Sequence, residues 1–137
     1  MRTVKKEDGT AAVELVLVAP ALILLLAVIV GSGRVVSTKS AVLSAAREAA
    51  RAAAEAPDVG TARSVALARA REVASGFGLD PARLSVQQTG SFDRGSAYEV
   101  RVSYRVQLSD LPAFGILPGS FAVTARHTEL TERYKSR

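Results

Sequence analysis

An uncharged apolar run near the N-terminus limits what this chain can fold into. No charged side chain occurs from Leu15 to Gly33. These 19 residues, at ~1.5 Å of helical rise each, come close to the roughly 20 that cross the hydrocarbon core of a bilayer. We therefore expect a membrane helix here. Pro20 lies inside it, removes one helical hydrogen bond and predicts a local kink.

Glu14 stands directly before this run and has two interpretations. A carboxylate costs about 2.5–3.5 kcal/mol at the centre of a bilayer and less towards its edge. Glu14 is therefore either a charge at headgroup depth, favoured there by the helix dipole, or a residue kept for a function. Its position alone favours neither interpretation.

Three arrangements of the N-terminus fit the sequence. In the first, residues 1–33 are a cleaved secretory signal, although the apolar run is longer than the usual stretch of about 7–15 residues. In the second, the run is a plain single-pass anchor. In the third, a hydrophilic leader of residues 1–9 is removed and the apolar helix remains. Basic residues in so short a leader favour a cytoplasmic N-terminus and an exported C-terminal part.

Helical patterns continue beyond the run. From Val35 to Ala56 the chain is rich in alanine, the strongest helix former, and the next helix breaker is Pro57. The small apolar stripe of this segment predicts close packing, either on the chain's own exported domain or in a filament or partner. A second helix is expected from about Thr61 to Ser75. Its apolar face is expected to include Ala62, Val65, Ala66, Val73 and Phe77.

The C-terminal part changes from helical periodicity to strand alternation. A short strand is expected at Leu84–Gln88, a long one at Tyr98–Leu108 and a third at Ser120–Glu129. The predicted fold class is α+β. It consists of a long N-terminal transmembrane helix continuing into an exported alanine-rich helix, a second helix, and a small three-stranded antiparallel sheet.

An apolar loop, residues 111–118, joins the last two predicted strands. Its large side chains are Leu111, Phe114, Ile116 and Leu117. Loops are usually polar because they run over the surface. This one is therefore either a partner-contact or membrane-facing loop, or a loop folded over the end of the sheet.

The composition argues against an enzyme. The chain has no cysteine and one histidine, His127, so thiolate chemistry is impossible and a histidine-based metal site or triad is hard to build. Glu129 and Glu132 lack the further ligands that would complete a metal set. Nucleophile-elbow and phosphate-loop motifs are missing from the sequence, and the net charge of +5 is dispersed, so nucleic-acid binding is not expected. We expect no catalytic residue, metal or cofactor.

The opening of the apolar segment resembles a known family. The stretch Gly9 to Pro20, Gly-Thr-Ala-Ala-Val-Glu-Leu-Val-Leu-Val-Ala-Pro, is similar to the start of TadE-like proteins, minor pseudopilins of the Tad (Flp-type) pilus system. Gly9 and Glu14 also fit the Gly-x-x-x-x-Glu pattern of type IV prepilin-like leaders. The resemblance covers roughly residues 8–50. Family members often carry an acidic residue shortly before a Gly-Arg pair, and this chain has Val30-Gly31-Ser32 there.

The resemblance implies a processing site and an assembly residue. A prepilin peptidase would cut between Gly9 and Thr10, which makes Glu14 the fifth residue of the mature chain. Glu14 would then pair with the new N-terminal amine of a neighbouring subunit. The implied domains are a leader (1–9), a transmembrane helix (10–33) and an exported pseudopilin domain (34–137).

The resemblance also implies partners and a location. The partners are prepilin peptidase, other Tad pilins, pseudopilins and assembly-platform proteins, and membrane lipid. The location is the cytoplasmic (plasma) membrane, single-pass, with the cell surface as a further location within a pilus. The alternative function is an uncleaved membrane-anchored binding module. The opening motif does not separate TadE from TadF relatives.

Overall fold

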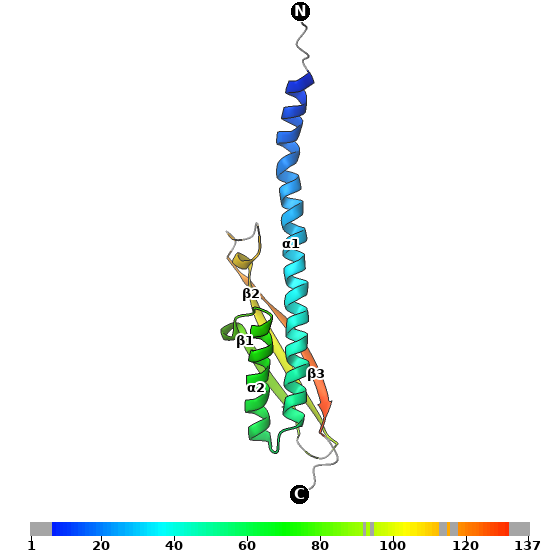
Figure 1. The fold of residues 1–137 in the computed structure, drawn as a ribbon, viewed down its shortest axis with the longest axis vertical. Helices are drawn as coiled ribbons and strands as arrows, with labels where there is room; N and C mark the ends of the chain where they lie inside the picture. The colour runs from blue at the N-terminus through cyan, green and yellow to red at the C-terminus, as the bar shows by residue number, and fades with distance from the viewer. Residues whose placement is uncertain (1–6, 92, 94, 113–114, 116–117, 132–137) are drawn as a thin grey trace, which may run out of the picture.

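The computed structural model describes residues 7–91, 93, 95–112, 115 and 118–131. Its helices are α1 (Glu7–Ala54) and α2 (Val59–Gly76), with short 3-10 turns η1 (Pro81–Arg83) and η2 (Leu108–Asp110). Its strands are β1 (Leu84–Gly90), β2 (Ala97–Gln107) and β3 (Ser120–Leu130). Figure 1 shows an elongated molecule in which the N-terminal half of α1 projects alone and the C-terminal half packs on α2 and the sheet. The predicted α+β fold is confirmed.

The membrane run and the alanine-rich segment form one unbroken helix. α1 continues through Pro20, so the expected kink does not interrupt it. It ends at Ala54 rather than at the predicted Ala56. The last turn tightens there, because Ala56 N–H donates to the carbonyl of Ala53 (3.1 Å) and the residue before Pro57 disfavours the helical region.

α2 begins at an aspartate cap, and its fully buried residues are all alanines, with the predicted Val73 partly buried beside them. The Asp58 carboxylate accepts a hydrogen bond from the Thr61 backbone N–H (2.9 Å), which satisfies one of the free donors at a helix start. The buried stripe of α2 consists of Ala62, Ala66, Ala70 and Ala74. The prediction that Val65 and Phe77 share this face is wrong, since they are 36% and 56% exposed.

Helix geometry explains why Val65 and Phe77 lie outside the buried face of α2. Residues four apart advance by a little more than one turn, so the four alanines form a narrow stripe, and side chains this small allow close approach to α1. The larger Val65 would hold the helices apart and lies outside the contact. Phe77 follows the end of α2 and no longer obeys its periodicity.

The sheet covers the helices with one face and exposes the other. The strand order is β1-β2-β3, all antiparallel. Along β2 the residues alternate as predicted, and the buried set is Tyr98, Val100, Val102, Tyr104 and Val106. β2 stops at Gln107 rather than Leu108. The outward side chains of β2 and β3 are mostly polar, as expected of an antiparallel sheet with one solvated face.

The alanine-rich half of α1 packs on the chain's own domain. Its fully buried residues include Val42, Ala45, Ala46, Ala49 and Ala53, which join the core with α2 and the sheet. Of the two alternatives left open by the sequence, own-domain packing therefore occupies this stripe. Other positions stay open, since Val36 is 65% exposed.

Candidate functional site

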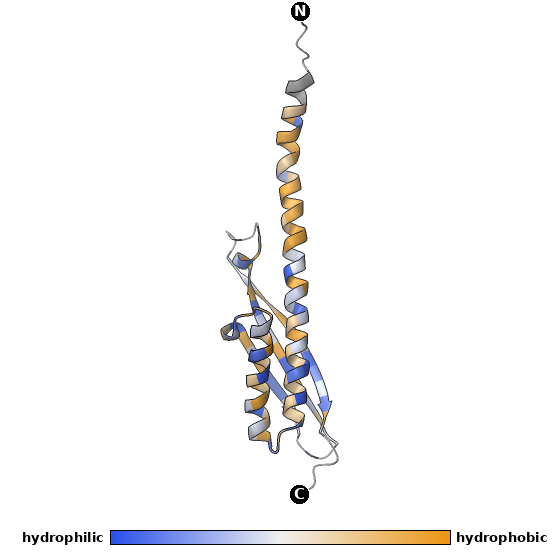
Figure 2. Cartoon of the chain, in the orientation of Figure 1, coloured by the Kyte–Doolittle hydropathy of each residue, from blue (hydrophilic) through white to orange (hydrophobic). Residues whose placement is uncertain are grey.

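The first functional feature is the bare apolar half of α1. Its large side chains are exposed, among them Leu15, Leu17, Leu24 and Ile29. Figure 2 shows the projecting segment coloured hydrophobic over most of its length, whereas the packed half of α1 is mixed. Within the described residues, one helix is long and apolar enough to cross a membrane. It is α1, and the apolar residues that meet this criterion lie in its projecting half. A surface of this kind needs lipid or another apolar partner.

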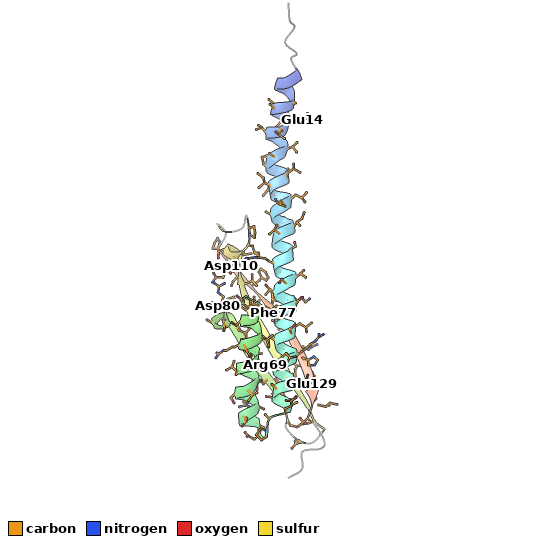
Figure 3. The ribbon with its side chains drawn as sticks, in the orientation of Figure 1. Glu14, Arg69, Phe77, Asp80, Asp110 and Glu129 are labelled. Carbon is orange, nitrogen blue, oxygen red and sulfur yellow. The ribbon has the colours of Figure 1, made fainter. Side chains whose placement is uncertain are left out.

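Glu14 lies exposed near the tip of that segment (Figure 3). It has no hydrogen-bond or ion-pair partner within the described part of the chain. It is also the only charged residue between Ala11 and Gly33. Any partner for this carboxylate must therefore come from solvent, from the headgroup layer or from another molecule.

The predicted cleavage bond lies at the start of the same helix. Gly9 and Thr10 belong to the first turn of α1, which begins at Glu7. Thr10 and Glu14 are four residues apart, about one helical turn. In the uncut chain the Gly9–Thr10 bond is therefore helical, and cleavage there remains a prediction.

A second feature is a groove where α1 leaves the folded domain. We call it the juncture groove; it has a volume of about 470 Å3. Its polar walls are Arg34, Ser37, Thr38, Asp80, Arg83 and Asp110, and its apolar walls are Ala41, Phe77, Leu79, Tyr104, Val106 and Leu111. Four elements meet there: α1, the end of α2, η1 with its flanking residues, and the end of β2 with η2.

Charged contacts tie these elements together. The Arg34 guanidinium donates through Nη1 to the backbone carbonyl of Asp110 (3.1 Å). Arg83 Nη1 lies 2.6 Å from Asp110 Oδ2, and Arg83 Nε lies 3.6 Å from Asp80 Oδ2. The hydrogen bond from Arg83 to Asp110 raises the pKa of Arg83, with the attraction of the same carboxylate as the next cause. The groove therefore holds two cations and two anions in balance.

The predicted contact loop is only partly within the described chain. Leu111 is half-buried and lines the juncture groove. Phe114, Ile116 and Leu117 lie outside the described residues. A contact of this loop with a partner therefore stays a prediction, now anchored at Leu111.

His127 faces α1 rather than a catalytic cleft. It pairs with the buried Val100 in the β2–β3 register and thus lies on the covered side of the sheet. Its Nε2 is 3.0 Å from Glu129 Oε1. Glu132 lies outside the described residues, and the described ones contain no group of three metal-binding side chains.

Sequence reasoning missed the juncture groove. Arg34 and Asp110 are 76 positions apart, so no local pattern links them. A weak signal lies in Asp80 and Asp110, since each follows shortly after the end of a helix or strand. Nothing in the sequence singled out Phe77 as an exposed ring.

Comparison with known proteins supports the sequence resemblance. The family model described as TadE-like protein matches residues 9–51, which confirms the predicted resemblance for this segment. No curated protein and no solved structure matches the chain. The matched segment contains Gly9, Glu14 and the entire exposed apolar half of α1.

Proposed function

We propose that this chain, TadE-like over residues 9–51, is a structural minor pseudopilin that prepilin peptidase processes and that contributes to assembly of a Tad-type pilus. The observation that carries the proposal is Glu14, a carboxylate without a partner in the described chain, five residues after Gly9 on a bare apolar helix. In this proposal residues 10–33 span the membrane and residues 34–137 are exported.

Cleavage would create a positively charged partner for the Glu14 carboxylate. The new amine at Thr10 would lie about one helical turn, ~6 Å along the axis, from the Glu14 of its own chain. It would lie level with the Glu14 of a parallel neighbour that is shifted along the axis by about one turn. Two unit charges ~4 Å apart attract with about 4 kcal/mol at an effective dielectric of 20. Desolvation removes much of this gain, so the pair sets helix register more than it adds stability.

The distribution of exposed surface supports an assembly role. The alanine stripe of α1 is occupied by the chain's own domain, so it is not available to a neighbour. The largest free apolar surface of α1 is the segment before Gly33, where the side chains are large and exposed. Other Tad pilins, pseudopilins or assembly-platform proteins would contact the chain along this segment, next to membrane lipid.

The mature N-terminus tests the processing step. Mass spectrometry of the chain from cells with prepilin peptidase should find Thr10 as the first residue, and Met1 in cells without it. Gly9→Ala should retain the leader, whereas Gly33→Ala should not, because an added Cβ at Gly33 meets no atom within 4 Å. A Gly9→Ala chain still cut before Thr10 would overturn the proposed cleavage site.

Glu14 is tested separately from cleavage. Glu14→Gln keeps the shape of the side chain and removes its charge. The variant should be processed normally. After cross-linking in membranes, fewer pilus components should be recovered with it than with the unaltered chain. Normal pilus assembly by Glu14→Gln, or an uncleaved wild-type chain in cells with the peptidase, would favour the membrane-anchored binding module.

A further inference from the structure

With residues 10–33 spanning the bilayer as in the proposed function, the juncture groove falls at the depth of the lipid headgroups. The hydrocarbon core is about 30 Å thick and the whole bilayer about 40–45 Å, which leaves about 5–8 Å of headgroups on each side. At ~1.5 Å per residue, that layer takes up about four or five residues of an upright helix. Because the apolar run ends at Gly33, these are the residues from Arg34 to Thr38. Arg34, Ser37 and Thr38 all line the groove.

The folded domain reaches the same depth. Arg34 donates to the Asp110 carbonyl, so η2 lies beside the first residue after the apolar run. Figure 1 shows this end of β2 reaching further along α1 towards its N-terminus than α2 does. In Figure 3, Asp110 lies at this end and Glu129 near the opposite end of the domain. In this placement the η2 end of the sheet would meet the bilayer surface instead of standing clear of it on a helical stalk.

The chemistry of the groove matches a zwitterionic headgroup. Arg34 and Arg83 offer guanidinium donors suited to a phosphate, and Asp80 and Asp110 offer carboxylates suited to a quaternary or primary ammonium. The exposed ring of Phe77 and the half-buried Leu111 add apolar surface beside them, a combination typical of protein surfaces at membrane interfaces.

We propose that the juncture groove and η2 bind the headgroups of zwitterionic phospholipids, which holds the η2 end of the exported domain against the bilayer surface. This inference rests on the transmembrane placement in the proposed function. The contact fixes the angle between the domain and the membrane, and so presents the outer sheet face sideways to neighbouring molecules. Extraction of the subunit into a filament would have to break this contact.

Tryptophan quenching tests the contact, because the chain has no tryptophan of its own. Full-length chains carrying one tryptophan each would be reconstituted in phosphatidylcholine vesicles whose acyl chains are brominated near the headgroup for the domain reporters and near the chain end for Leu24→Trp, which lies at the middle of the apolar run. Ser109→Trp and Leu111→Trp report on the groove end of the domain. Val59→Trp reports on the far end of α2, and Leu24→Trp reports on insertion of α1.

We expect bromine to quench Leu24→Trp strongly and both groove variants at least twofold more than Val59→Trp. Two groove reporters guard against a local disturbance at one position, since Ser109 is exposed and Leu111 is not. If Leu24→Trp is quenched but both groove variants behave like Val59→Trp, the groove faces water or a protein and the inference is overturned. If Leu24→Trp is not quenched, α1 is not inserted, and the proposed function fails together with the inference.

Discussion

The contact between α1 and α2 depends on side chains no larger than a methyl group, and Ala66→Leu tests this dependence. Ala66 is fully buried in the α2 stripe that packs on α1. Leucine adds three carbon atoms, which would contribute about 0.8 kcal/mol each if they could be buried without strain. Because the site is already closed, we expect the helices to separate and overpacking to cost about 1–3 kcal/mol.

This cost corresponds to a large change in melting temperature. For a domain of about 100 residues or fewer, 1 kcal/mol shifts the midpoint by roughly 4–8 °C. Ala66→Leu should therefore melt about 4–24 °C below the unaltered chain. Unfolding of the full chain in detergent can be followed by near-UV circular dichroism, because Tyr98 and Tyr104 are both buried in the folded domain.

Ala68→Leu is the matched control. Ala68 lies on the same helix but is exposed, since two residues along a helix point to nearly opposite sides. Its substitution should change stability by no more than about 0.5 kcal/mol. If Ala66→Leu and Ala68→Leu had the same melting temperature, close packing of α2 on α1 in the free chain would be refuted. The alanines would then have to serve a surface used only in assembly.

Three further predictions concern the turn, the open sheet face and alkaline pH. Gly90 has a φ of +130°, and an added Cβ would overlap the backbone at the start of β2. Gly90→Ala should therefore lower the free energy of unfolding by about 1–3 kcal/mol in urea denaturation. Arg126 lies directly opposite Arg101 on β2, so Arg126→Glu should raise the free energy of unfolding by about 0.2–1 kcal/mol, and less at high salt. Burial raises the pKa of Tyr98, which favours the neutral phenol in the folded state. The stabilisation by the neutral Tyr98 phenol is complete below the pKa of about 10 in the unfolded chain, and it is lost as the pH rises through the folded pKa. The melting temperature should therefore fall over this pH range, and it should fall less in Tyr98→Phe.

Each of these predictions has a control. An alanine at Gly76 meets no atom within 4 Å and should not destabilise the chain; a loss as large as at Gly90 would contradict the backbone argument. Arg105 is exposed and faces Ala122 across the strand pair. An equal gain from Arg105→Glu would assign the effect to net charge rather than to the Arg101–Arg126 pair. Parallel pH curves for Tyr98→Phe and the unaltered chain would refute the linkage.

The elements of the fold could be predicted because their signals are local. Alternation along β2 indicates directly which side chains are buried, and the fully buried Val100 and Val102 lie at alternate positions of the predicted strand. The continuous helix followed from the absence of breakers between Val35 and Ala54. Pro20 did not override this pattern, because an apolar helix retains its remaining hydrogen bonds.

The faces and contacts between elements could not be predicted with the same success. Hydrophobicity ranks valine and phenylalanine above alanine, whereas a closely packed helix pair selects the smallest side chains, which is why Val65 and Phe77 were misplaced. The juncture groove joins Arg34 to Asp110 through tertiary contacts that no periodicity encodes. Gly9 and Glu14 were found because a short motif places them within one stretch of chain.

The two halves of α1 have different consequences for assembly. In lipid, burying leucine or isoleucine against a neighbouring helix gains little, because the acyl chains are equally apolar. Close helix association in a membrane therefore favours small residues. Most alanines of α1 follow Gly33 and are buried in its own domain, whereas those before Gly33 are interspersed with large side chains. In the proposed pseudopilin, the large side chains before Gly33 suit lipid better than a tight helix pair. Glu14 can then fix the register of a neighbour without holding it strongly, and firm attachment to a pilus has to come from contacts of the exported domain.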